Sequence, residues 1–225
     1  MAGEDTRQRI LTAAERLFAE RGITATSMRA LTHAAGVNLA AAHYHFGSKE
    51  ALLDAVVERR ARPLNEARLC ELERLEEASG DASPDVEDIF RAFLMPTVRD
   101  MVAAPEDNLH LPRLFARVEA QPPEVLEALY RKHVGSAARR FVEALQRALP
   151  ELPKELVSDR FRLAMGAIFS LFSGNSELDF IPGHGPQVLS VEEKLEQVIG
   201  FVSGGMCTPH SARRAPGHRI DEAPR

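Results

Sequence analysis

The sequence predicts an all-α protein in two parts: a small N-terminal three-helix domain with a helix-turn-helix, and a larger helical domain. Apolar residues recur at three- and four-residue steps, beginning with Ile10, Leu11, Ala14, Leu17 and Phe18, and this is the helical period. No stretch shows the apolar–polar alternation of a half-buried strand. Glycine and capping residues then indicate where each helix begins and ends.

The first 60 residues are expected to form three short helices followed by a longer one. Gly22 ends the first helix, Ser27 caps the second, and the third covers residues 39–46 after a Gly36-Val37-Asn38 turn. Ser48 caps a fourth helix from residue 49 to about 60. Because a proline disfavours helix at the residue before it, Arg62-Pro63 predicts a kink or break there.

The rest of the chain predicts further amphipathic helices separated by loops. After the break, a helix is expected to reach residue 78, with the linker SGDASP over 79–84. The later helices are expected at 85–103 with a kink at Pro96, 109–120, 123–149, from Pro153 to about 173, and 191–203. A long loop covers 175–190. The pattern therefore divides the chain into a small helix-turn-helix part at 1–50, a larger helical part at 51–204, and a tail at 205–225 that is expected to be disordered.

Charge is distributed unevenly along the chain, whose net charge is −5. Residues 1–49 carry six basic and four acidic residues, and residues 205–225 carry four arginines and two acidic residues, which leaves −9 for the middle. A mildly basic head on an acidic body is typical of a protein in which only the head meets phosphate.

Composition argues against membrane and secreted classes. No apolar run approaches the ~18 residues of a membrane helix, and the polar start MAGEDTRQRI does not resemble a signal peptide. Cys70 and Cys207 lie far apart and fit no metal-ligand spacing. We therefore expect a cytoplasmic protein with free thiols, no cofactor and no membrane partner.

The segment AAGVNLAAAHYHFGSKEALL, residues 34–53, carries the functional signal. Two helices joined by a glycine turn form a helix-turn-helix, whose second helix enters the major groove of DNA. Its alanines leave that helix without bulk, while His43, Tyr44 and His45 supply polar groups and rings. Lys49, at the start of the following helix, suits a phosphate.

The two histidines of this segment leave roles other than DNA binding open. His43 and His45 would suit a zinc fragment, although no third ligand lies at a useful spacing. A catalytic histidine would need a nucleophile and an orienting acid, and no such set is visible, so we assign no catalytic residue and no metal ligand. A helical look-alike that binds protein in place of DNA, as an adaptor, is the third alternative.

Residues 10–57 resemble the DNA-binding domain of the TetR family of bacterial regulators. The matching pieces are AAERLFAERG, TSMRALTHAAGV and YHFGSKEALL, in the family's order and spacing. The resemblance implies DNA-contacting roles for these residues: Arg29, Asn38, Leu39, Ala40, His43, Tyr44, His45 and Lys49. Tyr44 also has a structural alternative, packing on the first helix, and Phe46 is expected in the core.

This chain departs from the family at the start of the recognition helix. Asn38-Leu39-Ala40-Ala41-Ala42-His43 stands where members commonly have Ser-Lys-Gly-Thr-Leu-Tyr. The usual lysine and threonine contacts to phosphate are therefore missing, and the operator cannot be transferred from a relative. A weaker resemblance, in GVNLAAAHYHFGSK and RPLNEARLCELERLE, is to the fatty-acid-responsive PsrA-like branch.

The resemblance implies that residues 1–50 are a DNA-binding domain and residues 51–204 a ligand-binding and dimerisation domain. It also implies a homodimeric repressor that releases a palindromic double-stranded operator on binding a small effector, and the PsrA-like branch suggests a fatty acid or acyl-CoA. The candidate pocket residues are Phe90, Phe93, Leu94, Arg113, Leu114, Arg117, Val118, Met165 and Phe169. We expect the dimer seam at residues 154–173 and 191–203, where small residues such as those of MGAIFSLFSG let helices approach.

Overall fold

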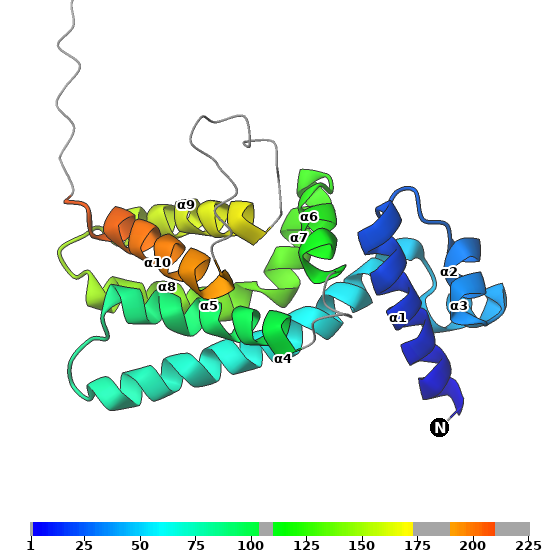
Figure 1. Cartoon of the computed structure of the whole chain (residues 1–225), viewed down its shortest axis with the longest axis horizontal. Helices are drawn as coiled ribbons and strands as arrows, with labels where there is room; N and C mark the ends of the chain where they lie inside the picture. The colour runs from blue at the N-terminus through cyan, green and yellow to red at the C-terminus, as the bar shows by residue number, and fades with distance from the viewer. Residues whose placement is uncertain (1, 104–109, 173–189, 210–225) are drawn as a thin grey trace, which may run out of the picture.

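The computed structural model describes residues 2–103, 110–172 and 190–209, and all regular structure in these ranges is α-helical (Figure 1). The all-α prediction is confirmed. The helices, in chain order, are α1 (Ala2–Arg21), α2 (Met28–Ala35), α3 (Leu39–Phe46), α4 (Lys49–Ser79), α5 (Val86–Ala103), α6 (His110–Glu119), α7 (Pro123–His133), α8 (Gly135–Ala148), α9 (Lys154–Phe172) and α10 (Val191–Cys207).

Helices α1 to α3 and the first turns of α4 form the head of the molecule. Each short helix starts at a side-chain cap, because the first turn of a helix leaves backbone N–H groups unpaired. Ser27 accepts from the Ala30 amide at 3.2 Å, Asn38 from Ala41 at 2.8 Å, and Ser48 from Ala51 at 3.1 Å. The apolar stripe predicted on the first helix is confirmed as core, whereas Ala42, expected with the other alanines of α3 near DNA, is buried. The head core contains Ile10, Leu11, Ala14, Leu17, Phe18, Leu31, Ala42, Leu52, Leu53 and Val56.

Of the kink or break predicted at Arg62-Pro63, the break is wrong, because α4 runs without interruption through Pro63 (Figure 1). The proline is exposed, whereas Ala61 and Asn65 on either side of it are buried. Packing of α4 on both sides of Pro63, against the head through Val56 and the body through Leu72, outweighs the ~3 kcal/mol that a proline costs within a helix.

The predicted single helix over 123–149 is also wrong, because the chain bends at Val134 between α7 and α8. Val134 has φ −119° and ψ −27°, and its amide still donates to the Tyr130 carbonyl. Gly135 weakens helix at this point. Two packing partners then separate the halves: Leu129 of α7 belongs to the head cluster, and Phe141 of α8 to the body cluster.

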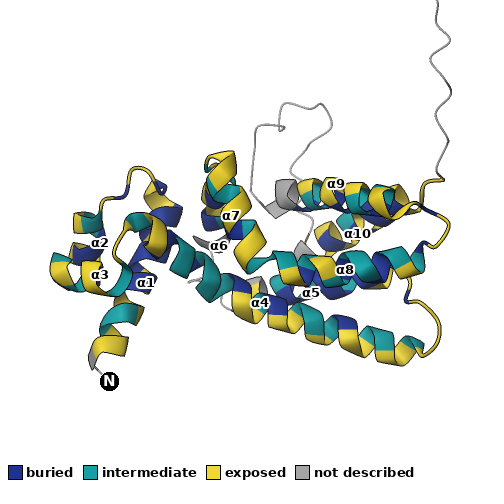
Figure 2. Ribbon diagram, turned by 180° about the vertical axis from the view of Figure 1, so that it is seen from behind, coloured by how far each residue is buried: buried dark blue, intermediate teal, exposed yellow. Residues whose placement is uncertain are grey.

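The body is a bundle in which α5 packs against α4, α8 and α10, with α9 lying beside α8 and α10 (Figures 1 and 2). Its aromatic centre joins three helices: Phe93 of α5 meets Phe141 and Phe161 edge-on, with ring centroids 5.0 and 6.1 Å apart. The linker predicted at 79–84 lies between α4 and α5, although Ser79 is still the last residue of α4. The last helix continues to Cys207, past the predicted end at 203, while the expected loop and most of the expected tail lie outside the described residues.

Helices α4, α6 and α7 connect head and body. Leu114 and Val118 of α6 are buried in the head cluster against α1. Asp54 of α4 pairs with two neighbouring residues of α7: Lys132 Nζ lies 2.6 Å from Oδ2, and His133 Nε2 lies 2.8 Å from Oδ1. Burial raises the pKa of Asp54, but the hydrogen bonds from Lys132 and His133 outweigh it and lower the pKa overall.

This pair predicts an acid-sensitive contribution to stability. A carboxyl whose pKa is lowered by folding stabilises the protein above its ordinary pKa, and this contribution is lost as pH falls below 3.8. Asp54→Asn should lower the free energy of unfolding by about 1 kcal/mol at pH 7. The gap between variant and wild type, measured by urea unfolding, should narrow as the solution is acidified below that value. A gap that stays constant would contradict the assignment.

Candidate nucleic-acid interface

The turn between α2 and α3 is held by a guanidinium group from α1. Gly36 has φ +63°, and its amide donates to carbonyls at the end of α2. Arg9 Nη2 donates to the carbonyls of Ala35 at 2.7 Å and Gly36 at 2.9 Å. A Cβ atom at Gly36 would lie 2.7 Å from that nitrogen. The site therefore needs glycine for its left-handed backbone and for the approach of the arginine.

The outward face of α3 is exposed as the helix-turn-helix prediction requires. Ala42 is buried in the head core, Phe46 is half-buried and packs against it, and Leu39 is half-buried. Ala40, His43 and Tyr44 are exposed, and Tyr44 is 86% exposed. The structural alternative for Tyr44, packing on the first helix, is therefore wrong. A large aromatic side chain left in solvent on a short, rigid helix is available for contact.

Two predicted residues of α3 have defined local partners. His43 Nδ1 donates to the Gly47 carbonyl at 2.9 Å, so the neutral ring carries its proton on Nδ1 and leaves Nε2 as an acceptor. An acceptor on this face can take a hydrogen bond from the amino group of adenine or cytosine in the major groove. The half-buried His45 ring lies edge-on to Tyr44, with centroids 5.3 Å apart.

The side chains of Asn38 and Lys49 form hydrogen bonds within the head. The side-chain oxygen of Asn38 caps α3, which leaves its amide nitrogen for an outside partner. Lys49 Nζ donates to the carbonyls of Ile23 at 3.1 Å and Thr24 at 3.3 Å, which ties α4 to the loop after α1. Arg29, on α2, is exposed and has no ion-pair partner among the residues that the structure describes.

Two arginines at the N-terminal end of α1 were not predicted from the sequence. Arg9 clamps the turn, and the guanidinium of Arg7 lies 5.5 Å from the centre of the Phe46 ring, the last residue of α3. The first turns of α1 therefore support both ends of the recognition helix. In the sequence these two arginines stand just before the apolar stripe that begins at Ile10, and this was the only available signal. Their proximity to the turn and to the end of α3 is decided by the fold.

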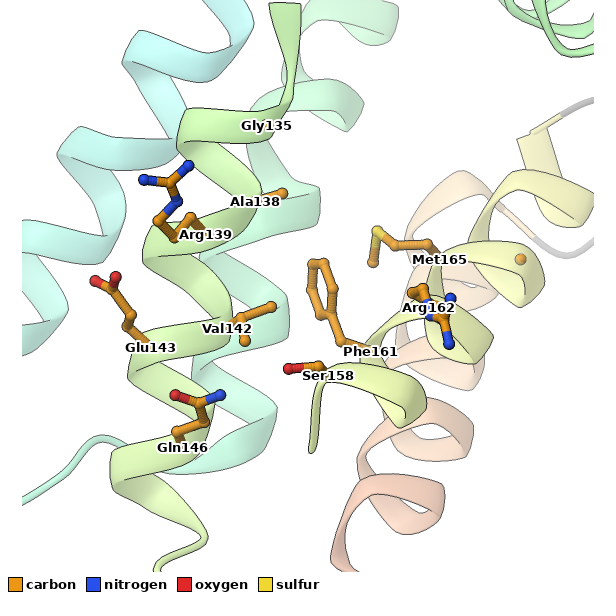
Figure 3. A pocket seen from close by; sticks show the side chains of 11 residues that line it. Gly135, Ala138, Arg139, Val142, Glu143, Gln146, Ser158, Phe161, Arg162 and Met165 are labelled. Carbon is orange, nitrogen blue, oxygen red and sulfur yellow. The ribbon is translucent and has the colours of Figure 1, made fainter. Parts of the chain in front are cut away.

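The predicted ligand-pocket residues are divided between separate parts of the molecule. Phe90, Phe93 and Leu94 belong to the body core, and Leu114 and Val118 to the head core. Arg113 and Arg117 are exposed on α6, with the Arg117 side chain near Gly22, and the Phe169 side chain lies outside the described residues. Met165 alone of the set lines a groove of about 590 Å³ between α8 and α9 (Figure 3).

The two segments predicted for the dimer seam lie side by side as α9 and α10. Among the side chains that the structure describes in these helices, Leu163 of α9 is 75% exposed and Phe201 of α10 is 74% exposed. Gly200, Gly204 and Gly205 of α10 are exposed, with open space where a side chain would stand. This face suits close approach of another helix.

Features of metal and membrane proteins are missing from the part of the chain that the structure describes. These residues contain no group of three or more histidine, cysteine, aspartate or glutamate residues that would hold a metal ion. None of the helices within them has both the length and the apolar character needed to cross a membrane.

Comparison with known proteins agrees with this geometry. Residues 10–56 match the description "Bacterial regulatory proteins, tetR family", and residues 91–205 match "Tetracyclin repressor-like, C-terminal domain". The regulator AcrR of Shigella flexneri is 30% identical over 116 residues, which cover 52% of this chain and 51% of AcrR. UidR of Escherichia coli K12 is 39% identical over 54 residues, 24% of this chain and 28% of UidR. The chain thus spans about half the length of the first relative and about a quarter of the second.

Solved structures show the same fold at low identity. The fatty acid degradation regulator FadR of Bacillus halodurans aligns with a TM-score of 0.64 at 16% identity, covering 89% of this chain and 95% of FadR. A putative tetR family regulator from Shewanella sp. PV-4 aligns with a TM-score of 0.60 at 18% identity, covering 88% and 96%. Likeness to FadR is in fold alone, so it lends no support to the PsrA-like branch.

A clamped turn, an exposed second helix and a helical body define a helix-turn-helix protein with a separate C-terminal domain. With its two parts matched over residues 10–56 and 91–205, the chain belongs to the tetR family of bacterial regulatory proteins. The family prediction is confirmed.

The Arg9 clamp predicts an interaction between two positions 27 residues apart. Gly36→Ala should destabilise the protein by about 2 to 3 kcal/mol, from left-handed backbone strain and displacement of the arginine. In an Arg9→Ala background the same substitution should cost only the backbone part, about 1 to 2 kcal/mol. Denaturant unfolding of the four proteins in this double-mutant cycle measures the difference. Equal costs in both backgrounds would show that Arg9 does not hold the turn.

Proposed function

We propose that the protein is a homodimeric repressor that binds a palindromic operator and releases it when a small effector binds the body. The exposed outer face of α3, centred on the 86% exposed Tyr44 and presented on a clamped turn, carries this proposal. A single short helix gives limited contact with DNA, and a two-fold pair of heads would read two half-sites about 34–36 Å apart.

The proposed contacts divide into base-reading and backbone groups. Ala40, His43 and Tyr44 face outward on α3 and are assigned to base edges, with Leu39 at their margin. The free amide nitrogen of Asn38, the half-buried His45 ring, Arg29 and the remaining N–H of Lys49 are assigned to the DNA backbone. Phosphate contacts orient a protein on DNA, whereas contacts to base edges supply specificity.

The proposed dimer joins α9 and α10 of two copies in a four-helix bundle. Leu163 and Phe201 would be covered in this arrangement, and the exposed glycines of α10 would let the helices approach closely. Removing two exposed apolar side chains per copy from water favours association.

The proposed response passes from body to head through α4, α6 and α7. Effector binding would change how α6 presents Leu114 and Val118 to α1, or how α7 presents His133 to Asp54. Either change alters the spacing of the two heads, so affinity is lost at both half-sites together. The effector must bind the two arrangements with unequal affinity, otherwise no shift occurs.

For the effector we propose an apolar or amphipathic small molecule, with fatty acids and acyl-CoA as the first compounds to test. The apolar core of the body supports this class. The fatty acid degradation regulator shares the fold, but that likeness does not identify a ligand.

The DNA-binding proposal is tested by selecting bound sequences from a random DNA library with the purified protein. We expect a palindromic motif whose binding weakens as salt rises, because phosphate contacts release counterions. Tyr44→Ala and His43→Ala should each reduce affinity for the selected site by about 5- to 150-fold, as one lost base contact is worth ~1–3 kcal/mol. Arg131→Ala, a control on exposed α7, should leave it unchanged. The adaptor class would instead give no enriched sequence at low salt.

The dimer proposal is tested by sedimentation of apolar-to-acidic variants. Leu163→Asp and Phe201→Asp would each place two buried, unpaired carboxylates in the bundle and should turn the dimer into monomer at micromolar concentration. Ala67→Asp, at an exposed position of α4, is the matched control and should remain a dimer. Dimeric variants at both sites would place the seam elsewhere.

A further inference from the structure

The groove between α8 and α9 has an apolar floor that no other part of the described chain fills. Its walls are Ala138 and Val142 of α8 and Phe161 and Met165 of α9, whose side chains face one another across the gap (Figure 3). Its volume of about 590 Å³ lies within the range of small-molecule sites, ~300–1,000 Å³. Methionine adapts its shape to an irregular apolar ligand.

Charged groups stand along the rim of this groove, and one of them lacks a partner. Arg162 of α9 pairs with Asp159 at 2.6 Å, and Glu143 of α8 lies 3.7 Å from Arg140. Arg139 of α8 is exposed and forms no ion pair or hydrogen bond with any residue in the described ranges. Arg139 is one of the residues that line the groove, but in Figure 3 its guanidinium points away from α9, so contact with an occupant of the groove requires another rotamer of this exposed side chain. The rim therefore has one uncompensated positive charge beside an apolar trough.

The floor of the groove is connected to the helix that carries the head. Phe161 stacks on Phe90 with ring centroids 6.4 Å apart and meets Phe93 edge-on at 6.1 Å. The Arg68 guanidinium of α4 in turn lies 3.9 Å from the centre of the Phe93 ring. An occupant that moves Phe161 therefore acts on α4 through two aromatic rings in contact.

We propose that this groove binds an amphipathic monoanion, a carboxylate carrying an alkyl chain, with the chain along Val142, Phe161 and Met165 and the carboxylate at Arg139. Apolar walls favour the chain by removing it from water. A guanidinium is the side chain best matched to a carboxylate, because it donates two parallel hydrogen bonds. Regulation by such a ligand rests on the proposed function, whereas its binding does not.

The binding test uses the full-length protein with ¹³C-labelled methionine methyl groups, and dodecanoate and dodecan-1-ol as probes. Dodecanoate should shift the Met165 methyl signal saturably, and dodecan-1-ol, which has the same chain without the charge, should bind about tenfold more weakly. Met165→Leu identifies the signal. A titration in which other methionines respond and Met165 does not would overturn the groove assignment, as would the absence of any dodecanoate binding.

Three variants distinguish the contribution of the positive charge at the rim from that of the apolar trough. Arg139→Gln should weaken dodecanoate about tenfold and leave dodecan-1-ol unchanged, and Arg131→Gln, the same charge change on exposed α7, should affect neither. Ala138→Trp, which fills the trough, should abolish binding of both. An unaffected Arg139→Gln would overturn the carboxylate contact. Loss of the dimer in Ala138→Trp, seen by sedimentation, would instead make the groove a contact between two copies of the chain.

Operator affinity is measured separately, with and without dodecanoate. Weaker operator binding in wild type and unchanged operator binding in Arg139→Gln at the same concentration would support the regulatory role. Dodecanoate bound in the groove with unchanged operator affinity would remove that role and leave the binding site. If the protein selects no DNA sequence, the proposed function is refuted. Whether the groove binds dodecanoate is then decided by the methionine titration alone.

Discussion

The continuity of α4 through Pro63 is the constraint on which the rest of this structure depends. Its 31 residues extend about 46 Å and belong to the cores of both parts of the molecule. Leu52 and Val56 are fully buried in the head, and Leu72 is fully buried in the body. A rigid helix shared by two cores has no free linker in which a movement of the body can be absorbed, so a rotation at one end reaches the other.

Apart from the continuous helix α4, the head and the body are held together mainly by apolar contacts. Leu114 and Val118 of α6 are buried against α1, and each contributes ~1.5–3 kcal/mol by leaving water. The ion pair of Asp54 with the exposed Lys132 contributes less than these apolar contacts, because water screens it. Because apolar contacts are non-directional, α6 can slide on α1 at a smaller cost than that of breaking a hydrogen-bond network.

The guanidinium group of Arg68 links α4 to the aromatic centre of the body. Arg68 Nε donates to the Phe93 carbonyl at 2.9 Å and Nη2 donates to Thr97 Oγ1 at 3.0 Å, while the guanidinium lies over the Phe93 ring. Burial lowers the pKa of Arg68 to about 10, so it stays charged at neutral pH. These contacts are made to the residues three before and one after Pro96, where α5 lacks one backbone donor. The Phe93 ring also contacts Phe161. Arg68 therefore supports the same ring through which an occupant of the groove would act on α4.

The sequence alone determined the all-α class, the helix-turn-helix and the family, because glycine turns, capping residues and the 3.6-residue period act within a few residues of each other. The position of Gly36 between two capped helices is such a local signal.

Tertiary structure decided what local rules got wrong: α4 continues at Pro63 because two cores hold it, and α7 and α8 separate at Val134 because they pack on different cores. It also decided that Phe90 and Phe93 fill the body core while Leu114 belongs to the head, and that Arg9 reaches Gly36. Such contacts join residues far apart in the chain, and helical periodicity shows which face of a helix is apolar but not which partner covers it.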